Sequence, residues 1–563
     1  MSRPDDPVTT TPSPPAWWPE ARFGLFIHWG VYAVPAGVHR GKTYAGASEW
    51  LMHSVKIPIA DYKSYAADFT AENYDPESWV RAAKDAGMGY VVIGAKHHDG
   101  FTLYDTVIND WHASRDLLLP LAEACRRHDL PLGFYYSQAQ DWVNGGAAFG
   151  EKWDTAQEGD FDSYLDRVAI PQITELLTRY GSGIPAVLWW DTPAEMTPSR
   201  AARVDAAVQR LAPGILQNDR LGLASGGGHF DTPEQRIPAI RPSRPWETCM
   251  TTNESWGFNL HDHAWKSPTL LLRQLAEVVS QGGNYLLNIG PRPDGTIPEP
   301  SLAALAAVGA WMRVNGDAIR GASAGPFPHR LPWGFATTHG DTLYLLIENW
   351  PADGRLSIPL LDLPISARLL AEPATLLSVN SADGAFTLQL PVTAPDPALT
   401  VVALHYAKPP RLGAVPVRPR PPVIPQPADG ALTLRAADAE VIGDHLSLTA
   451  GPDPQLGCWT GLESHPLWRV RLHQGGTYRV ELDYAVPAHR QGTLAHVAFG
   501  DQRLPFIADG TGGWGDFVRT PSGVITLAPD EELHIRVLPV SIPVGAVMNL
   551  RAVHLTPASL PFA

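Results

Sequence analysis

The stretch RFGLFIHW, residues 22–29, is an apolar run that ends abruptly at a histidine and a tryptophan. Three later runs have the same form: YVVIGAKHHDG at 90–100, AVLWWD at 186–191 and GILQNDR at 214–220. A short run that is apolar throughout predicts a strand buried on both faces, as in a parallel sheet. The carboxyl ends of such strands meet at one rim, which carries the active site in (β/α)8 barrels. The polar residues that end these runs therefore predict a catalytic pocket.

Helical patterns precede most of the predicted strands. The segment DPESWVRAAKDAGM at 75–88 opens with Asp-Pro, carries apolar residues at helical spacing and is closed by a glycine, which is typical of a helix. Four further helices, each followed by an apolar strand, are predicted at 121–128, 164–180, 203–211 and 268–280. Repeated helix–strand units predict a (β/α)8-like TIM barrel over residues 16–327. Eight clean strands cannot be counted, so we expect a somewhat irregular barrel.

The rest of the chain has a different sequence pattern. Short strands separated by turn residues predict a β-sandwich over 328–408. Residues 409–429 form a Pro-rich linker, and residues 430–563 again resemble short strands, which predicts a second, jelly-roll-like C-terminal β-sandwich. We expect the Pro/Thr-rich residues 1–15 to form a disordered tail. The predicted fold class is multidomain, α/β followed by all-β.

Composition excludes several classes of protein. The 563 residues carry a net charge of −15, which argues against nucleic acid or an anionic membrane as a partner. The three cysteines are widely separated and form neither a disulfide framework nor a metal-binding spacing. The first residues lack a basic and apolar leader, and no run is long enough to span a bilayer. We therefore expect a cytoplasmic protein, or a secreted or periplasmic one if a leader has been removed.

Carboxylates supply the candidate chemistry. Asp191 ends the run AVLWWD, where its side chain would project into the rim. A carboxylate there suits the nucleophile of a retaining glycosidase, although an aspartate at this place could instead cap the next helix. The partner carboxylic acid must lie about 5–5.5 Å away. Glu234 and Glu247 are both candidates, and their spacing in the sequence does not choose between them.

Histidines, aromatic residues and one arginine complete the predicted pocket. His28, His97 and His98 suit hydrogen bonds to sugar hydroxyls better than a metal, because neighbouring strand residues face opposite sides and no third ligand has a recognisable spacing. We therefore expect neither a metal nor a cofactor. Further members of a pocket for one monosaccharide are Glu49, Trp50, Tyr136, Trp189 and Arg220. In GGNYLLNIGPRPDGTIP, residues 282–298, we expect a structural role, with Asn284 and Asn288 tying the backbone together.

Taken together, these segments resemble the α-L-fucosidases of glycoside hydrolase family 29. The motifs that occur in the family's order are FGLFIHWGVYAVPA, SEW, KDAGMGYVVIGAKHHDGF, GFYYS, LWWD, NDR, TPEQ, WETC, SWGFN and GGNYLLNIGPRPDGTIP. They cover residues 17 to about 325, and the β-rich segment to about 408 is similar to the family's C-terminal sandwich. The ordered set is specific, whereas no single motif would be.

The resemblance implies an exo-acting retaining α-L-fucosidase whose partner is a fucosylated oligosaccharide or glycoconjugate. It implies Asp191 as nucleophile, Glu234 as the first choice of acid/base and Glu247 as the second. The implied fucose-binding residues are His28, Glu49, Trp50, His97, His98, Tyr136, Trp189 and Arg220. Tyr135 is the alternative to Tyr136, because the register of that strand is open. An ionised nucleophile and a protonated acid predict a bell-shaped dependence of rate on pH.

Finer expectations concern the substrate and the last domain. The TPEQ and WETCMTTNESWGFN segments resemble the branch of the family that prefers α-1,3/1,4-linked fucose in branched, Lewis-type glycans. The alternatives are a broad specificity that includes α-1,2 linkages, a glycosidase that acts on another 6-deoxy sugar or on galactose, and a non-catalytic fucose-binding protein. Trp190 and Thr192-Pro193 depart from the family's usual pattern, which bears on the leaving-group side. The domain from 430 onward either binds carbohydrate through Trp459, Trp468 or Trp514, or packs against the barrel.

Overall fold

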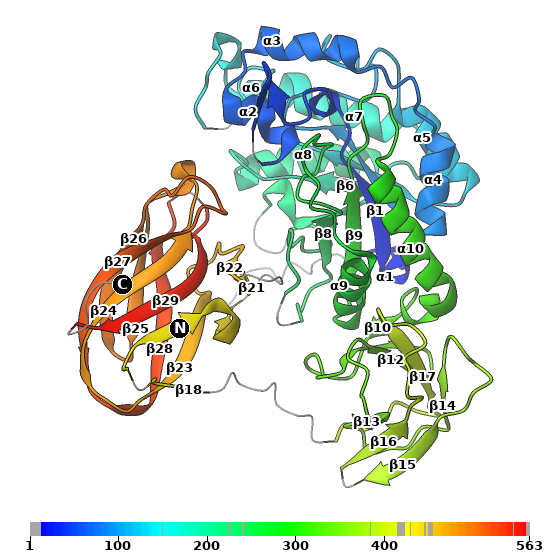
Figure 1. Cartoon of the computed structure of the whole chain (residues 1–563). Coiled ribbons are helices and arrows are strands. Elements are labelled where there is room, and N and C mark those ends of the chain that lie inside the picture. Colours follow the sequence, from blue (N-terminus) through cyan, green and yellow to red (C-terminus); the bar gives the residue numbers. More distant parts are fainter. Residues whose placement is uncertain are drawn as a thin grey trace, which may run out of the picture. The chain divides into compact units, whose positions relative to one another are not determined.

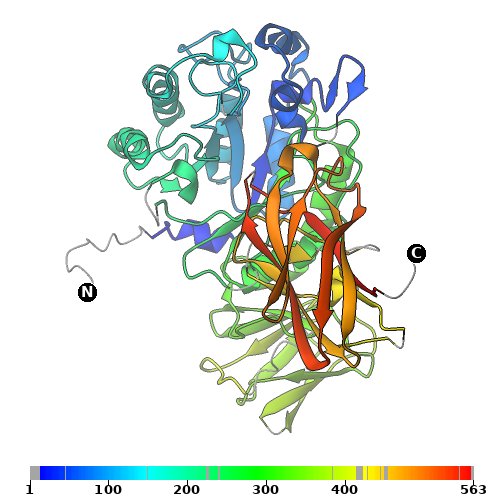
Figure 2. The same cartoon turned by 90° about the vertical axis from the view of Figure 1, so that its left-hand side faces the viewer.

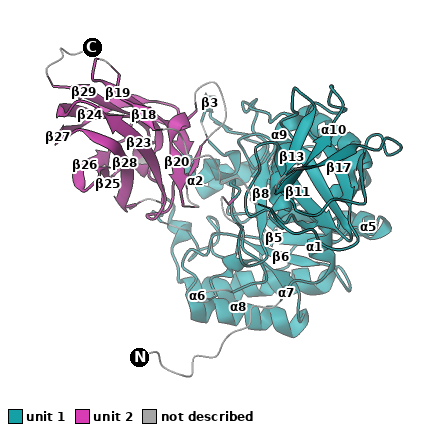
Figure 3. Cartoon of the chain, turned by 90° about the horizontal axis from the view of Figure 1, so that it is seen from below, with its two compact units in different colours: residues 1–237, 241–415 teal, residues 238–240, 416–563 magenta. Residues whose placement is uncertain are grey.

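The chain divides into two compact units, residues 1–237 with 241–415 and residues 238–240 with 416–563 (Figure 3). The computed structural model describes residues 13–44, 46–148, 150–223, 227–238, 241–382, 384–413, 423–427, 429–443, 446–448, 454–543 and 545–558. Residues 1–12 of the predicted tail and residues 414–422 and 428 of the predicted linker lie outside the described residues. The domain boundaries remain predictions.

The first unit contains a parallel sheet of seven strands in the order β7-β6-β5-β4-β1-β9-β8 (Figure 1). The strands are β1 (Phe23–Ile27), β4 (Val91–Lys96), β5 (Leu132–Tyr136), β6 (Val187–Trp190), β7 (Leu216–Gln217), β8 (Glu247–Thr251) and β9 (Asn284–Ile289). All their residues are buried. The apolar runs of the sequence thus correspond to strands covered on both faces.

Alternate residues of these strands enter two apolar cores. Ile27, Tyr136 and Trp190 belong to the core shared with the helices. Phe26 and Trp189, each one residue earlier on its strand, belong to a smaller core on the opposite face. Successive side chains of a strand point to opposite faces, so a single-residue change of register would exchange the two sets.

Helices follow the strands. Those that overlap the five predicted helical segments are α4 (Pro76–Asp85), α5 (Leu118–Arg127), α7 (Ile170–Arg179), α8 (Pro198–Leu211) and α9 (Pro268–Ser280). The others are α1 (Trp17–Ala21), α2 (Leu51–Val55), α3 (Ile59–Lys63), α6 (Phe161–Tyr164) and α10 (Glu299–Asn315). Asp75 and Ser267 cap the amino ends of α4 and α9 with their side chains, ahead of a proline in the first turn. Within the described part of the chain, no helix has both the length and the apolar character needed to span a membrane.

The predicted eight-stranded barrel is only partly formed. Between β7 and β8 the described residues form no further strand of the sheet. They form three isolated parallel bridges, Asn218 with Phe230, Asp231 with Trp246, and Glu234 with Cys249 of β8. The intervening sequence, 221–245, is rich in glycine and proline and lacks a continuous apolar run. Glycine and proline interrupt the hydrogen-bonded ladder, so the parallel α/β sheet is confirmed as a half-barrel and the complete barrel is not.

The remaining strands of the first unit form two antiparallel sheets. The larger contains β10 (Ser323–Ala324), β11 (Gly334–His339), β12 (Thr342–Ile347), β17 (Thr400–His405) and β14 (Ser366–Leu369). The smaller contains β13 (Arg355–Ile358), β16 (Ala385–Gln389) and β15 (Ser378–Ala382). Leu345 and Leu404 of the larger sheet belong to the same buried cluster as Leu356 and Phe386 of the smaller one. A short hairpin, β2 (Val38–His39) with β3 (Lys42–Thr43), lies apart from both sheets.

The second unit is all-β (Figure 2). One sheet contains β18 (Ile424–Pro425), β23 (His465–Leu472), β28 (Asp530–Ser541), β25 (Thr493–Phe499), β26 (Gln502–Ala508) and β20 (Glu440–Ile442). The other contains β21 (Ser447–Leu448), β22 (Leu456–Gly457), β29 (Asn549–Pro557), β24 (Gly476–Ala485), β27 (Val518–Leu527) and β19 (Leu432–Arg435). Trp459 and Trp468 are fully buried in the core of this unit, so neither is a surface for carbohydrate, whereas Trp514 is 39% exposed.

A substitution at Leu25 tests how much the central strand β1 contributes to the stability of the first unit. Leu25 is fully buried and pairs with Val91 of β4 and Leu287 of β9. We expect Leu25→Ala to destabilise this unit by about 2–5 kcal/mol, because the truncation leaves a cavity. The measurement is the midpoint of urea unfolding followed by tryptophan fluorescence. Leu302→Ala, at an exposed position of α10, is the control and should leave the midpoint nearly unchanged; equal shifts for both variants would contradict the prediction.

Candidate active site

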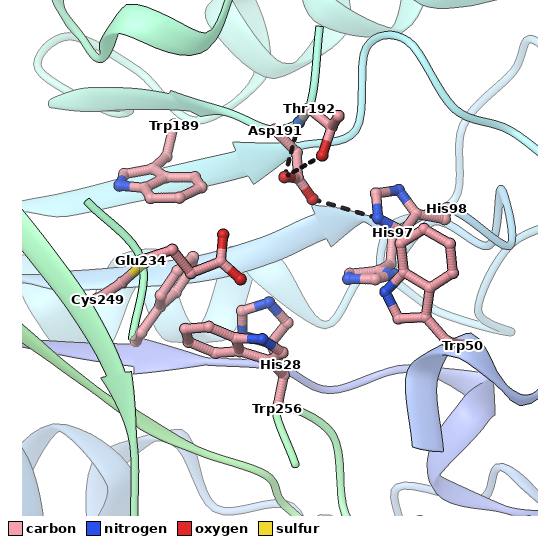
Figure 4. A pocket seen from close by; sticks show the side chains of 11 residues that line it. His28, Trp50, His97, His98, Trp189, Asp191, Thr192, Glu234, Cys249 and Trp256 are labelled. Carbon is pink, nitrogen blue, oxygen red and sulfur yellow. Dashed lines mark hydrogen bonds and ion pairs between the residues drawn. The ribbon is translucent and has the colours of Figure 1, made fainter. Parts of the chain in front are cut away.

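A pocket with about 400 Å³ of empty space lies at the carboxyl ends of the parallel strands (Figure 4). The residues that line it are Phe26, His28, Trp50, His97, His98, Trp189, Asp191, Thr192, Glu234, Cys249 and Trp256. Seven of the eleven were predicted from the sequence as substrate-binding or catalytic residues, namely His28, Trp50, His97, His98, Trp189, Asp191 and Glu234. Strand ends therefore bring together residues that are far apart in the chain.

Asp191 follows the last residue of β6 and is held from several sides. Its Oδ2 accepts a hydrogen bond from the Tyr135 hydroxyl and lies 3.3 Å from His98 Nε2, while its Oδ1 accepts from the Thr192 amide at 2.7 Å. Burial favours the neutral acid, but His98, Arg220 and the Tyr135 hydroxyl outweigh it, so the pKa of Asp191 is lowered. Helix α8 is capped by Thr197, which removes the alternative that Asp191 caps the next helix. The side chain is an ionised carboxylate that faces the pocket.

Arg220 joins the two carboxylates of the pocket. It lies in the short helical turn Asp219–Leu221 after β7, and its Nη1 is 3.4 Å from Asp191 Oδ1 and 2.8 Å from Glu234 Oε2. The two oxygens are therefore at most about 6 Å apart, the sum of these contacts. Arg220 is itself fixed by Thr232, which accepts from its Nε and Nη2. Asp191 and Glu234 thus lie side by side at one pocket.

Glu247, the second candidate for the acid, lies elsewhere. It begins β8, is 1% exposed and does not line the pocket. Its carboxylate accepts hydrogen bonds from Trp189 Nε1 at 2.9 Å, Trp18 Nε1 at 3.3 Å and the Tyr90 hydroxyl. Burial raises the pKa of Glu247 to about 7, against the opposing effect of these donors. Glu247 is therefore bonded to the lining residue Trp189 without itself lining the pocket.

The buried histidines are neutral at physiological pH. Burial lowers the pKa values of His28 and His98 to about 4 and that of His97 well below its usual range. Asn288 donates through Nδ2 to the Trp256 carbonyl, so its Oδ1 accepts from His28 Nδ1 at 2.7 Å. His28 consequently carries its proton on Nδ1 and offers the lone pair of Nε2 to the pocket. The sequence suggested only that Asn288 ties the backbone together. In the structure it also sets the position of the proton on His28.

Among the described residues, several buried polar atoms near the pocket have no protein partner. His97 Nδ1 and Glu49 Oε1 are two of them. The other Glu49 oxygen accepts from the Gly257 amide at 2.9 Å, and burial raises the pKa of Glu49 to about 7. Glu49 and its neighbour Trp50 lie in the helical turn Ser48–Trp50. An unsatisfied buried polar atom is costly, so these atoms are places where the hydroxyls of a ligand would be stabilised.

Tyr136 is the one predicted pocket residue that the structure moves to the other face of its strand. Its hydroxyl donates to Gln172 Oε1, and its ring lies in the core shared with the helices. Tyr135, the alternative, donates to Asp191 and stacks on His97 with ring centroids 5.3 Å apart. Side chains alternate along a strand, so only one of two adjacent tyrosines can face the pocket, and the sequence does not identify it.

Several residues of the site were not predicted from the sequence. Cys249, Trp256 and Phe26 line the pocket although only their surrounding motifs were noted. Gln138 is fully buried and joins two loops: its Nε2 donates to the carbonyls of Asp191 and Arg220, and its Oε1 accepts from the Asp191 amide. A glutamine after a strand end is common in any loop, so only the tertiary contacts identify it.

One group of side chains could offer ligands to a metal ion. Among the described residues, His97, His98 and Asp191 have ligand atoms within 4.8 Å of one another. The guanidinium of Arg220, 3.4 Å from Asp191, would repel a divalent cation at this place. The residues therefore suit a polar organic ligand better than a metal.

Comparisons with known proteins agree on one family. The sequence profile of the family described as Alpha-L-fucosidase matches residues 4–317, more than half of the chain. The structure of alpha-L-fucosidase isoenzyme 1 from Paenibacillus thiaminolyticus is 36% identical, with 70% of this chain and 98% of that chain covered and a TM-score of 0.64. An alpha-L-fucosidase from Vibrio sp. strain EJY3 is 25% identical over 96% of this chain and 97% of that chain, with a TM-score of 0.67.

A third similar structure bears on chemistry. It is an alpha-L-fucosidase from Bacteroides thetaiotaomicron, described as a trapped covalent intermediate in complex with 2-fluoro-fucosyl fluoride. It is 27% identical, covers 69% of this chain and 94% of that chain, and has a TM-score of 0.63.

The tautomer of His28 can be tested through Asn288. We expect Asn288→Asp to raise the pKa of His28 from about 4 by about 1 to 3, because a carboxylate beside Nδ1 stabilises the imidazolium. NMR titration of the histidine ring protons measures this. Asn284→Asp, the same change at the other end of β9, where the side chain donates to the Trp18 carbonyl, is the control and should not move it. An unchanged His28 pKa in Asn288→Asp would refute the assignment.

Proposed function

Because the chain belongs to the alpha-L-fucosidase family and is a glycoside hydrolase, we propose that it releases terminal L-fucose with retention, Asp191 acting as nucleophile and Glu234 as acid/base. The observation that carries this proposal is the position of Arg220, whose Nη1 contacts both carboxylates. The limit of about 6 Å that it sets on their separation is below the about 6.5–9.5 Å of inverting enzymes, which must fit a water molecule between the two groups.

The reaction then proceeds in two displacements. An Asp191 oxygen attacks the anomeric carbon while Glu234 gives its proton to the leaving glycosidic oxygen, so the C–O bond to the aglycone breaks and a fucosyl–aspartate ester forms. Water next attacks the anomeric carbon, Glu234 takes a proton from that water, and the bond to the Asp191 oxygen breaks, so that Asp191 leaves as a carboxylate. The lowered pKa of Asp191 supports the first role. The trapped covalent intermediate of the Bacteroides thetaiotaomicron relative supports the same chemistry.

The lining of the pocket supports fucose rather than a sugar with a hydroxymethyl group. Phe26, Cys249 and Trp256 give it apolar surface, against which the methyl group of a 6-deoxy sugar can pack. His28 Nε2, His97 Nδ1 and Glu49 Oε1 are the polar atoms left for ring hydroxyls. Trp50, His98, Trp189 and Arg220 complete the set inferred from the sequence, with Tyr135 in the place of Tyr136.

For the linkage, we propose α-1,3/1,4-linked fucose in branched, Lewis-type glycans. The TPEQ and WETCMTTNESWGFN segments support this through their resemblance to the branch of the family with that preference. Glu234, within TPEQ, lies at the pocket with 42% of its side chain exposed, and the loop that carries it is therefore placed to meet the leaving group. Broad specificity including α-1,2 linkages and a non-catalytic fucose-binding protein remain the competing proposals.

Variants of the two carboxylates separate their roles. We expect Asp191→Gly to lower kcat at least about 1,000-fold for every substrate. Glu234→Ala should lower kcat about 100- to 10,000-fold for substrates with poor leaving groups. It should lower kcat far less for a dinitrophenyl fucoside, whose leaving group needs no acid. Steady-state rates with and without azide are the measurement. Azide should give β-fucosyl azide with Asp191→Gly and α-fucosyl azide with Glu234→Ala.

The control for both variants is Asp110→Gly, whose side chain is 95% exposed and which should keep the wild-type rate. Normal hydrolysis by Asp191→Gly would overturn the assignment of the nucleophile. A Glu234→Ala variant that loses the same factor for good and poor leaving groups would remove Glu234 from the acid/base role.

The linkage proposal needs a panel of substrates. We expect fucose release, measured by chromatography, from 3- or 4-fucosylated Lewis trisaccharides and at least about 10-fold less efficient release from 2-fucosyllactose, a difference of about 1.4 kcal/mol in transition-state binding. Equal efficiency on both would discard the linkage preference and keep the fucosidase. Binding of fucose without release from any substrate would favour the non-catalytic alternative.

A further inference from the structure

Glu247 binds three large aromatic side chains at once. Its Oε1 accepts from Trp189 of β6, and its Oε2 accepts from Trp18 of α1 and from Tyr90, which precedes β4. All four residues are buried. Tyr90 can reach this place because Gly24 of β1 lacks a side chain: a Cβ there would lie 2.4 Å from the tyrosine ring. The backbone of the central strand is thus adapted to this cluster, which we call the Glu247 cluster.

The Glu247 cluster continues into the pocket through Trp189. The indole of Trp189 lines the pocket, while its Nε1 is 2.9 Å from Glu247. The guanidinium carbon of Arg220 lies 5.0 Å from the centre of the same indole, a cation–π contact. Arg220 in turn contacts Asp191 and Glu234. A continuous series of contacts therefore joins Glu247 to the two carboxylates of the pocket.

We propose that Glu247 is a positioning residue: it fixes the Trp189 indole, and through it Arg220, in the place that sets the separation of Asp191 and Glu234. The proposal rests on the proposed function, because it takes the roles of these two carboxylates from there. It assigns Glu247 a role other than that of acid/base, since both of its oxygens are occupied by buried donors and neither faces the pocket.

The substitution Glu247→Gln tests the idea without changing the size of the side chain. A carboxylate accepts at both oxygens, whereas an amide has one acceptor oxygen and an NH2 group that would face a donor. We expect kcat/KM to fall about 10- to 100-fold, because a small misplacement of reacting groups has an effect of this size. The fall should be the same for a dinitrophenyl fucoside and for a poor leaving group, and azide should not restore the rate.

Two further variants show whether Glu247 acts through Trp189. Trp189→Phe keeps an aromatic ring but removes the Nε1 donor to Glu247. We therefore expect the double variant Trp189→Phe/Glu247→Gln to have a kcat/KM less than about 3-fold below that of Trp189→Phe alone. The two losses would then be far from additive, as expected when one residue acts through the other. Glu175→Gln is the matched control: Glu175 also accepts two hydrogen bonds, from Thr106 Oγ1 and the Val107 amide, but does not line the pocket. It should keep the wild-type kcat/KM for both fucosides.

Each contrary result has a distinct meaning. A loss for poor leaving groups alone, restored by azide, would make Glu247 the acid/base and overturn the proposal, and Glu234→Ala would then keep its activity. Additive losses in the double variant would show that Glu247 does not act through Trp189. Wild-type kinetics in Glu247→Gln would also overturn it.

Where Glu247→Gln does not fold, as judged by circular dichroism, Tyr90→Phe is used instead. It removes one donor from Glu247 and keeps the ring, and should lower kcat/KM about 2- to 10-fold with no dependence on the leaving group. Wild-type kinetics in Tyr90→Phe, together with unfolding of Glu247→Gln, would limit Glu247 to a role in stability and overturn the proposal.

Discussion

The guanidinium of Arg220 contacts Asp191 and Glu234 through a single nitrogen atom, and the rest of the site is arranged around this contact. Two carboxylates this close repel each other unless a cation compensates them. Thr232 fixes the guanidinium from one side, and Trp189 covers it on the other. Gln138 binds the backbone carbonyls of both Arg220 and Asp191, so the two loops that carry the charges cannot move independently.

Burial then gives the acidic groups different protonation behaviour within one small region. The pKa of Asp191 is lowered because cationic and hydroxyl partners outweigh its burial, whereas burial raises the pKa values of Glu49 and Glu247 to about 7. The histidines of the pocket are neutral for the same reason. This environment separates the pKa of Asp191, which is paired with the cation Arg220, from the raised pKa values of Glu49 and Glu247, whereas the residue types alone would titrate much closer together.

The tryptophans show how far composition can mislead. Trp50, Trp189 and Trp256 line the pocket, and they are large flat groups of the kind that a sugar-binding site uses. Trp459 and Trp468, which the sequence offered as candidates for carbohydrate binding, instead fill the core of the second unit, with Trp468 bonded to the Arg435 carbonyl. An apolar aromatic residue on a strand is equally suited to a core and to a binding face. Only burial distinguishes the two.

The sequence by itself determined the parallel α/β region, half of the ten α-helices that the structure describes and most of the pocket. Short apolar runs that end in polar residues, each preceded by a helical pattern, are typical of strands buried on both faces, and the ends of parallel strands meet at one edge. Three features were decided by the tertiary structure: which of Tyr135 and Tyr136 faces Asp191, which of Glu234 and Glu247 lies at the pocket, and how completely the barrel closes. Each depends on strand register or on the path of an irregular loop. Those are set by packing between distant segments, and one residue of register reverses the face of every side chain on a strand.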